Sequence, residues 1–322
     1  MQALQEKRPG YNWELLQSEP APGAGHVVSI ANQKGGVGKT TTSVNLAAAL
    51  ALRGHRVLVV DMDPQGNATT GTGVDRSGVR ASSYELLIGE VTVSDVIRPT
   101  PIPKLEVVPA HPDLAGAEVE LVSEYGRERK LADALHGVAD DYALTIVDCP
   151  PSLGLLTVNA LVAAQSLVVP VQCEYYALEG LGALMNNAER IRRAVNPNLR
   201  VAGFLLTMYD ARTKLSSQVA DEVRDHFKQL VFSTVVPRSV RLSEAPSFGE
   251  PVLTLDPSSR GAISYKLLAA EVEKRYGLVL EPSAAFAPPR PGPGGRGYGT
   301  TTPVPADLER SWPRRMPWGD EG

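Results

Sequence analysis

Residues 31–42 read ANQKGGVGKTTT, and the second half of this stretch decides the fold. Gly38-Lys39-Thr40 ends a phosphate-binding loop of the pattern G-x-x-x-x-G-K-[ST], the P-loop. An apolar segment precedes it and a helical pattern follows it, which is the strand–loop–helix context that such a loop requires. Two details depart from the simple pattern: Gln33 stands where the first glycine is expected, and a second lysine, Lys34, lies beside it.

On both sides of this loop, between residues 26 and 280, apolar runs alternate with helical patterns. The predicted strands are residues 27–31, 57–61, 105–109, 144–148, 167–171, 201–207 and 232–236. The predicted helices are residues 40–53, 113–123, 129–138, 155–164, 177–195, 215–230 and 259–276. Continuous apolar strands interleaved with helices predict a mostly parallel sheet that is covered by helices on both faces. We therefore expect one α/β domain of the P-loop NTPase type over residues 26–280.

The two ends of the chain have a different composition. Residues 1–25 are polar and form a predicted N-terminal extension. Residues 281–322 form a Pro/Gly-rich tail that we expect to be disordered, because this composition cannot bury enough apolar surface to offset chain entropy. All three tryptophans lie in these two ends. The sequence RSWPRRMPW at 310–318 is either incidental or a short partner-binding motif.

Charge and cysteine content narrow the class of protein. The net charge of the 322 residues is -4, but residues 190–241 hold ten Lys/Arg against four Asp/Glu, a local charge of +6. Such a local basic region matters more for DNA binding than the total charge. Cys149 and Cys173 fit no disulfide framework or zinc spacing. There is no signal-peptide core and no apolar run of about 18 residues that could span a bilayer, so we expect a cytoplasmic protein. A Pro/Gly-rich end in place of an amphipathic helix argues against membrane binding.

The loop residues have the chemistry of a nucleotide site. Gly35, Gly36 and Gly38 allow backbone N–H groups to approach phosphate oxygens, and the helix that follows adds its partial positive charge. Lys39 is expected to reach the β- and γ-phosphates, Thr40 to bind Mg²⁺, and Thr41 to contact the α-phosphate. A glycine-rich turn without a ligand is the alternative, and the lysine and threonines argue against it.

Three aspartates lie at strand ends near the loop. Asp61 and Asp63 stand in VVDMDPQGN after the second strand, and Asp148 ends a later strand in TIVDCPPSLG. Ligands of open α/β sheets bind at the carboxyl ends of the strands. A carboxylate that ends an apolar strand is the usual Walker-B group, which holds Mg²⁺ directly or through water. Caps of helices or turns are the alternative for a single aspartate, but three together favour the metal and nucleotide site.

Six segments together resemble the ParA/Soj family of chromosome- and plasmid-partition ATPases, within the wider deviant-Walker-A group that includes MinD and the nitrogenase iron protein. The segments are KGGVGKTTT, DMDPQGN, DCPPSLG, VQCEYYALEG, TMYDART and PRSVRLSEAPSFG. The resemblance covers residues 26–280, and the last three segments are not generic to nucleotide binding.

The resemblance implies roles for individual residues. Lys34 is the signature lysine that reaches the nucleotide of a partner subunit in an ATP-bound dimer, and Asp63 orients the attacking water. Asp61 lies near the metal, and Asp148 is the Walker-B carboxylate. The further ATP-binding residues implied are Gly35, Gly36, Val37, Gly38, Lys39, Thr40, Thr41, Pro237 and Ser239. Many relatives have Asn at the position of Ser239, which leaves its base contact open.

The resemblance also implies partners. These are ATP and Mg²⁺, a second copy of the chain, duplex DNA without sequence preference, and a ParB/Spo0J-type centromere-binding protein that stimulates hydrolysis. Nucleoid association in the cytoplasm follows from the DNA partner. The candidate DNA-binding residues are Arg238, Arg241, Arg212, Lys214 and Lys266, with a solvated, locally paired surface as the alternative. Other readings are a MinD-like membrane regulator, an iron–sulfur reductase, and a scaffold that positions other cargo.

Overall fold

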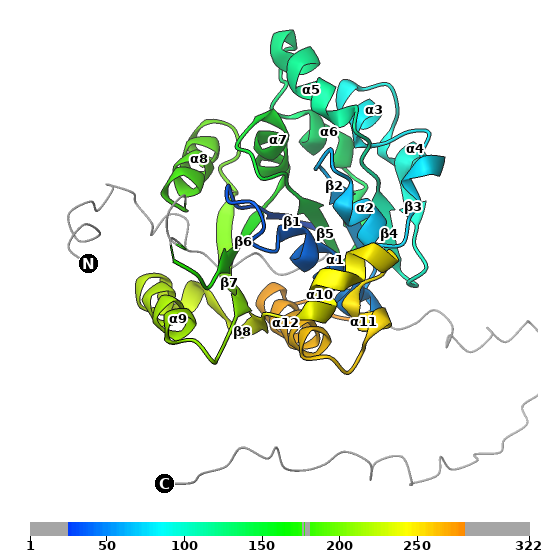
Figure 1. The fold of residues 1–322 in the computed structure, drawn as a ribbon. Coiled ribbons are helices and arrows are strands. Elements are labelled where there is room, and N and C mark those ends of the chain that lie inside the picture. The colour runs from blue at the N-terminus through cyan, green and yellow to red at the C-terminus, as the bar shows by residue number, and fades with distance from the viewer. Residues whose placement is uncertain (1–24, 176, 178–180, 281–322) are drawn as a thin grey trace, which may run out of the picture. The chain divides into compact units, whose positions relative to one another are not determined.

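Eight strands form the central sheet of the protein, in the spatial order β3-β4-β2-β5-β1-β6-β7-β8 (Figure 1). The computed structural model describes residues 25–175, 177 and 181–280. The predictions for residues 1–24 and for the tail at 281–322 therefore lie outside the described residues. The strands are β1 His26–Ile30, β2 Val57–Asp61, β3 Arg98–Pro99, β4 Leu105–Val108, β5 Leu144–Asp148, β6 Ser166–Gln172, β7 Arg200–Tyr209 and β8 Val231–Pro237.

The sheet is parallel except at one edge. β1 lies between β5 and β6, and all three strands run in the same direction. The two-residue strand β3 pairs antiparallel with β4 at the end of the sheet. Because parallel strands end at the same side, the loops that follow β1, β2 and β5 come together, and these loops carry the candidate nucleotide residues.

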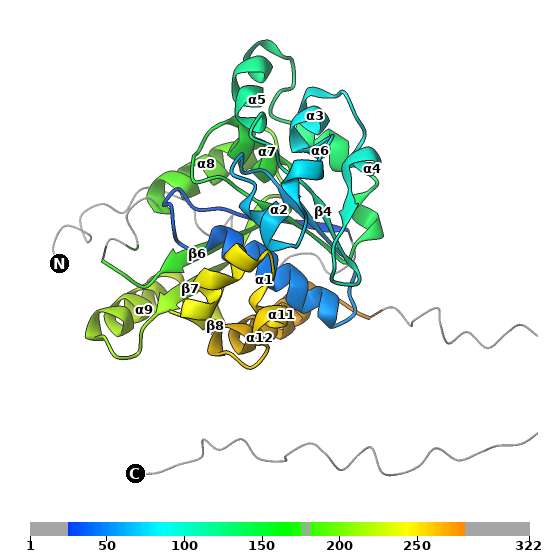
Figure 2. The ribbon, with the colours of Figure 1, turned by 45° about the vertical axis from the view of Figure 1, so that its right-hand side comes forward.

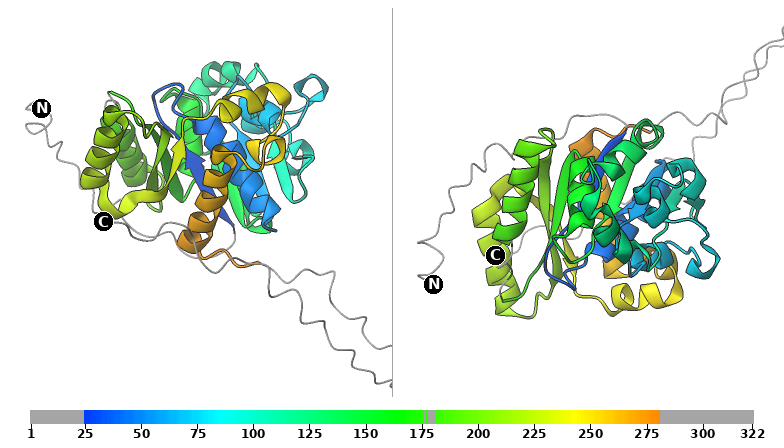
Figure 3. Two further views of the ribbon diagram at one scale, coloured as in Figure 1. Left: turned by 60° about the horizontal axis from the view of Figure 1, so that its bottom comes forward. Right: turned by 90° about the horizontal axis from the view of Figure 1, so that it is seen from above.

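Helices cover both faces of the sheet (Figures 1 and 2). They are α1 Lys39–Leu52, α2 Asn67–Gly71, α3 Ser83–Ile88, α4 Val93–Val96, α5 Leu114–Glu120, α6 Lys130–Leu135, α7 Leu155–Ala163, α8 Leu181–Ala194, α9 Lys214–Phe227, α10 Val240–Glu244, α11 Val252–Leu255 and α12 Arg260–Tyr276. One layer includes α5 to α8, and the other includes α1 and α10 to α12, as the views from below and above show (Figure 3).

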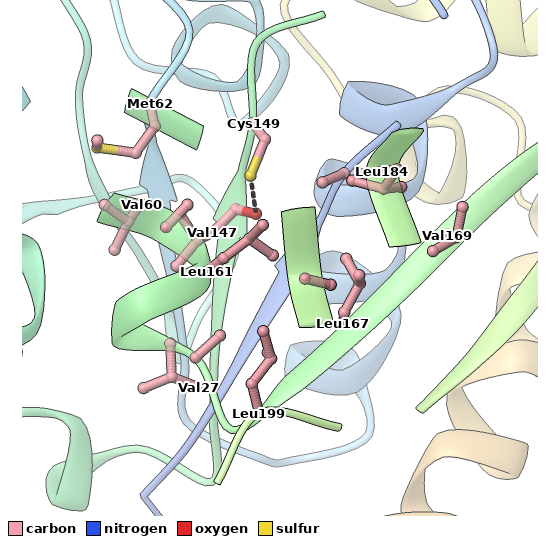
Figure 4. Close-up of a cluster of buried hydrophobic side chains, with 14 of the residues drawn as sticks. Val27, Val60, Met62, Val147, Cys149, Leu161, Leu167, Val169, Leu184 and Leu199 are labelled. Carbon is pink, nitrogen blue, oxygen red and sulfur yellow. Dashed lines mark hydrogen bonds between the residues drawn. The ribbon is translucent and has the colours of Figure 1, made fainter. Parts of the chain in front are cut away.

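Two apolar cores result, one on each face, because side chains alternate along a strand. In β2, Leu58 and Val60 belong to the core under α5 to α8, whereas Val57 and Val59 belong to the core under α1 and α12. Figure 4 shows part of the first core, to which Val60 of β2, Val147 of β5, Val27 of β1 and Leu167 of β6 all belong. Burial on both faces explains why the strands read as continuous apolar runs.

The seven strands and seven helices expected from the sequence are confirmed in the described residues, with bounds that differ by a few positions. The strand β3 and the helices α2, α3, α4, α10 and α11 were not predicted. These helices have four to six residues, too few for a helical apolar period to be read. Capping boxes at Ser82/Glu85 and Thr92/Asp95 mark the starts of α3 and α4 and were available in the sequence.

None of the helices in the described part of the chain is both long enough and apolar enough to cross a lipid bilayer.

Candidate nucleotide-binding site

The P-loop connects β1 to α1, and its glycines hold it open. Gly38 precedes the helix with a φ of 90°, and Gly36 has a φ of 72°, both in the left-handed region that favours glycine. A Cβ added to Gly35 or Gly36 would meet no heavy atom within 4 Å. Their backbone therefore faces open space at the N-terminus of a 14-residue helix, which is the arrangement that binds phosphate.

Side chains outside the motif fix the shape of the loop. Asn32 accepts a 3.0 Å hydrogen bond from the Lys34 backbone N–H and donates a 2.7 Å bond to the carbonyl of Pro170 in β6. The Thr207 hydroxyl in β7 donates a 2.8 Å bond to the Val37 carbonyl. Sequence reasoning missed Asn32 and Thr207 as anchors, since each hydrogen bond joins the loop segment to a strand far away in the sequence. The loop is thus tied by side-chain hydrogen bonds to β6 and β7.

The two lysines of the loop lie in opposite environments. Lys39 is 7 % exposed, and its Nζ donates a 3.2 Å hydrogen bond to the Lys34 carbonyl. Burial lowers the pKa of Lys39, and the nearby Asp148 carboxylate partly opposes that shift. The Lys34 side chain is exposed, and no side-chain hydrogen bond or ion pair joins it to another described residue. One lysine therefore faces inward to the loop, and the other faces solvent.

Asp148, at the end of β5, meets the first turn of α1. Its Oδ2 accepts a 2.8 Å bond from the Thr40 hydroxyl, and its Oδ1 accepts a 2.7 Å bond from Ser43. Asp148 is fully buried, and its pKa is raised by burial and by the neighbouring Asp61 charge. A hydroxyl beside a carboxylate is a hard oxygen donor set that suits Mg²⁺. Ser43 was missed by the sequence analysis, although it follows Lys39 by one helical turn.

Asp61 is directed at the neighbouring helix. Its Oδ2 accepts bonds of 2.7 Å from both the backbone N–H and the hydroxyl of Thr69, and its Oδ1 accepts a 3.1 Å bond from the Asp63 N–H. Asp61 is fully buried, and burial raises its pKa. In β-sheet register it stands directly opposite Asp148. The structure thus brings Asp61 to the site as a neighbour of Asp148 whose oxygens already hold α2 in place.

Asp63 lies in the turn after β2. One of its oxygens, Oδ1, accepts a 3.0 Å bond from the Gln65 N–H, and the residue is 7 % exposed. The Asp63 charge contributes to the electrostatics of both Lys39 and Asp148. It therefore lies at the same end of the sheet as the P-loop, as the sequence predicts.

The remaining ATP-binding candidates occupy two places. Thr41 lies in the first turn of α1, and its carbonyl accepts a 2.9 Å bond from Asn45. Pro237 ends β8, and Ser239 immediately precedes α10, where its carbonyl accepts a 3.3 Å bond from Ser243. Pro237 is paired in register with Tyr209 of β7, the strand that also carries the loop anchor Thr207.

The candidate DNA-binding cations are mostly paired with local acceptors. Arg212 makes bonds of 2.9 and 2.7 Å to both oxygens of Asp210, and Arg238 pairs with Glu174. Arg241 lies 3.2 Å from Glu244 and 3.4 Å from Asp256. The Lys266 ammonium donates to the Pro257 carbonyl, and Lys214 begins α9. These ion pairs involve exposed groups and contribute little to stability, so they can exchange for other anions.

Both cysteines are buried, and they follow strands that are not neighbours in the sheet. Cys149 follows β5 and Cys173 follows β6, with β1 between those strands. Burial raises the pKa of both thiols, to about 11 for Cys173. Within residues 25–175, 177 and 181–280 there is no group of three His, Cys, Asp or Glu side chains placed to hold a metal ion. A P-loop Mg²⁺ site does not need one, because substrate phosphates and water supply most of its ligands.

Comparison with known proteins places this site in a family. Residues 25–201 match the family model of an AAA domain. The chain is 54% identical to the sporulation initiation inhibitor protein Soj of Bacillus subtilis over 248 residues, which cover 77% of this chain and 98% of that protein. It is 52% identical to the chromosome partitioning protein ParA of Myxococcus xanthus over 78% of this chain and 89% of that protein.

A solved structure gives the same fold. The cobyrinic acid a,c-diamide synthase of Mycobacterium smegmatis, crystallised with ADP and magnesium, superposes with a TM-score of 0.69. It is 38% identical over 78% of this chain and 95% of that chain. Identity to the partitioning proteins is higher and extends over nearly their whole length. The geometry of the P-loop and the similarity beyond it lead to one assignment: this chain belongs to the ParA/Soj family of chromosome-partitioning ATPases.

Proposed function

We propose that the chain is an ATPase that dimerises around ATP, binds duplex DNA without sequence preference as a dimer, and is stimulated to hydrolyse ATP by a ParB-type partner. The observation that carries this proposal is the contrast between the two P-loop lysines. Lys39 is buried against its own loop, whereas Lys34 extends into solvent from the same loop. A cation in that position is available to the nucleotide of a second subunit.

The residues of one subunit hold the nucleotide and its metal. Bound Mg²⁺ neutralises negative charge on the β- and γ-phosphates. Backbone N–H groups of residues 35–38 and the helix N-terminus bind phosphate oxygens, Lys39 contacts the β- and γ-phosphates, and Thr41 the α-phosphate. Thr40 and Asp148 would hold the metal, with Asp61 beside them. Pro237 and Ser239 are the residues that would lie near the adenine base.

Hydrolysis needs two further groups. Asp63 accepts a hydrogen bond from the attacking water and orients it toward the γ-phosphate. Lys34 of the second subunit adds positive charge where negative charge develops in the transition state. A cation supplied in trans is worth about 10³–10⁵ in rate in other P-loop enzymes. Dimerisation and hydrolysis are therefore coupled, and we expect slow turnover in the monomer.

The partners follow from the family and from the charge distribution. Dimerisation brings Arg238 and Arg241, and in second rank Arg212, Lys214 and Lys266, onto one surface for DNA phosphates. Phosphate contacts of this kind give affinity that falls steeply with salt. We infer an ATPase domain over residues 26–280, with extensions at 1–25 and 281–322, in a cytoplasmic protein that associates with the nucleoid.

The test is the oligomeric state of Lys34→Ala. This variant should bind ATP as the wild type does, because Lys39 and the loop glycines are intact, but should stay monomeric on sizing chromatography with ATP and Mg²⁺. Gln33→Ala is the matched control, since Gln33 is the exposed neighbour in the same loop and should dimerise normally. A Lys34→Ala protein that dimerises with ATP contradicts the trans role of this lysine.

The partner is tested by ATPase activity measured with DNA, with and without the candidate centromere-binding protein. Stimulation only when both are present supports chromosome partition. Stimulation by neither favours a related protein that positions another cargo.

A further inference from the structure

Arg76 lies against the turn that carries Asp63, between β2 and α2. It is half-buried and begins the short helix η3, Arg76–Gly78. Its Nη1 donates a 2.5 Å hydrogen bond to the Gln65 carbonyl, and its Nη2 donates a 3.4 Å bond to the Pro64 carbonyl. Both hydrogen bonds that the guanidinium makes to described residues therefore go to the main chain of the turn, and neither goes to a carboxylate.

Asp63 holds the other side of the same two peptide groups. Its Oδ1 accepts a 3.0 Å bond from the Gln65 N–H, and its carbonyl accepts a 2.8 Å bond from the Gly66 N–H. Because a peptide group is planar, the Pro64 carbonyl and the Gln65 N–H move as one unit. The Gln65 carbonyl and the Gly66 N–H form the next unit. Two rigid peptide planes therefore lie between Arg76 and Asp63, and each is held at its carbonyl end by the first and at its N–H end by the second.

The side chain of Arg76 also covers the turn. Gly66 is buried and has a φ of 63°, in the left-handed region. A Cβ added to Gly66 would lie 2.5 Å from the Nε of Arg76 and 2.6 Å from its Cζ. Glycine is required here by the backbone conformation and by this close approach. A movement of the turn toward η3 would therefore have to displace the guanidinium.

The segment that carries Arg76 is itself fixed. Asp75 precedes η3, and its carboxylate accepts bonds of 2.9 Å from the Ser77 N–H and 2.7 Å from the Ser77 hydroxyl. The Val74 N–H donates a 3.3 Å bond to the carbonyl of Thr69 in α2, the helix that follows the turn. Arg76 thus reaches back to the turn from a segment that is anchored to the next helix.

We propose that Arg76 is a positioning residue for ATP hydrolysis that acts through Asp63. This role rests on the proposed function, in which Asp63 accepts a hydrogen bond from the attacking water. The Oδ1 of Asp63 is engaged by the Gln65 N–H, and no described residue donates a hydrogen bond to Oδ2, which leaves that oxygen for the water. Arg76 fixes the peptide plane that carries the Gln65 N–H, so it fixes the direction in which Oδ2 points.

The loss of Arg76 should affect the rate of hydrolysis and not the binding of ATP. Without Arg76 the two peptide planes are held only at their N–H ends, and the Asp63 carboxylate rotates with them. A misplacement of about 1 Å in a positioned group lowers a rate by about 10²-fold. The P-loop lies outside this contact, because the printed partners of the Arg76 guanidinium are the carbonyls of residues 64 and 65. The affinity for ATP should therefore be kept.

Phosphate release by the full chain at varied ATP concentration, with Mg²⁺ and duplex DNA, tests the proposal. Arg76→Ala should lower kcat by about 10- to 100-fold. The KM for ATP and the ATP-dependent dimer on sizing chromatography should match those of the wild type. A raised KM with an unchanged kcat would assign Arg76 to nucleotide binding and overturn the proposal.

Two further replacements separate hydrogen bonding from packing. Arg76→Met keeps an unbranched side chain over Gly66 but donates no hydrogen bond, and it should lose as much kcat as Arg76→Ala. Arg76→Lys keeps a hydrogen-bond donor and should recover most of the loss. A wild-type kcat in Arg76→Met would show that only packing matters and would overturn the proposal. Arg80→Ala is the matched control, because Arg80 is an exposed arginine four positions further on, and it should leave kcat and KM unchanged.

A double-mutant cycle with Asp63 tests the route, with phosphate release measured in single turnovers. In an Asp63→Ala background, Arg76→Ala should change the rate by no more than about twofold, because the group that it positions is already absent. A further loss of about 10-fold or more would show that Arg76 acts independently of Asp63, which overturns the proposal. Undiminished release by Asp63→Ala alone would overturn the catalytic role of Asp63 and this role of Arg76 with it. A loss in Asp63→Ala beside a wild-type rate in Arg76→Ala would overturn the role of Arg76 alone.

Discussion

The nucleotide end of the sheet and the arginine-bearing surface carry charge in different ways. At the nucleotide end, Asp148 and Asp61 are fully buried, and their carboxylates accept hydrogen bonds from hydroxyls of α1, from Thr69 of α2 and from the Asp63 N–H. On the surface, the exposed side chains of Arg212 and Arg241 are paired with the partly buried Asp210 and the exposed Glu244. Buried charges must be held in one geometry, whereas exposed pairs exchange partners at little cost. Substitutions should therefore have large effects at the first region and small, salt-dependent effects at the second.

The largest effect is expected at Asp63. Asp63→Ala should lower phosphate release by about 10²–10⁴-fold, because the positioned acceptor for the attacking water is lost. Nucleotide affinity should remain close to that of the wild type, and an ATP-bound dimer should accumulate. Phosphate release and sizing chromatography with ATP measure the two outcomes. Undiminished release would remove Asp63 from the catalytic site.

A smaller effect is expected from a buried polar group away from the nucleotide. His26 of β1 lies 2.7 Å from the Ser166 hydroxyl and packs edge-on against Tyr276, and burial lowers its pKa to about 4. Because the unfolded chain binds the proton more readily, this group costs stability as the pH falls from about 6.5 toward 4. The loss should reach about 2–3 kcal/mol near pH 4.5.

His26→Gln removes that titrating group and keeps a hydrogen-bonding side chain. Urea unfolding at pH 7.5 and at pH 4.5 compares the two proteins. The wild type should lose more free energy of unfolding between these pH values than the variant does. Equal losses would show that His26 is not a source of acid sensitivity.

The smallest effect is expected on the surface. Arg238→Glu with Arg241→Glu should weaken binding to random duplex DNA, and each lost phosphate contact should reduce the slope against log salt by about 1. Dimerisation with ATP should be preserved. Arg80→Glu is a charge-matched control at an exposed residue outside the candidate set. Gel shifts over a salt series measure the effect, and equal slopes for all proteins would place the DNA surface elsewhere.

The same contrast explains what could be predicted from the sequence. The P-loop and the strand-end aspartates are predictable because spacing alone brings Thr40 and Asp148 to the same edge of a parallel sheet, and they meet at 2.8 Å. The anchors Asn32 and Thr207 were not predictable, because each hydrogen bond joins the P-loop segment to a strand that is distant in sequence, Asn32 to β6 and Val37 to Thr207 of β7.

The ion-pair partners of the candidate DNA-binding arginines could not be predicted from the sequence either. The pairing of Arg238 with Glu174 joins residues 64 positions apart, and that of Arg241 with Asp256 joins α10 to the end of α11. A count of charged residues along a segment gives its net charge, but it does not show which acid each arginine pairs with. The prediction of a net positive region at residues 190–241 is therefore compatible with a surface whose candidate cations are mostly paired in the structure.

Strand β7 fixes the distance between the nucleotide end of the sheet and the surface that carries Arg238. Thr207 of β7 bonds to the P-loop, and two residues later the Tyr209 carbonyl accepts a 2.9 Å bond from the Arg238 N–H. Met208 between them has a φ of 52°, in the left-handed region. Inserting one residue here would turn Tyr209, the last residue of β7, to the opposite face of the sheet. Insertions and deletions can be accommodated in the surface loops of this protein. A change of length across residues 207–209 would break either the Thr207 bond to the P-loop or the Tyr209 bond to Arg238.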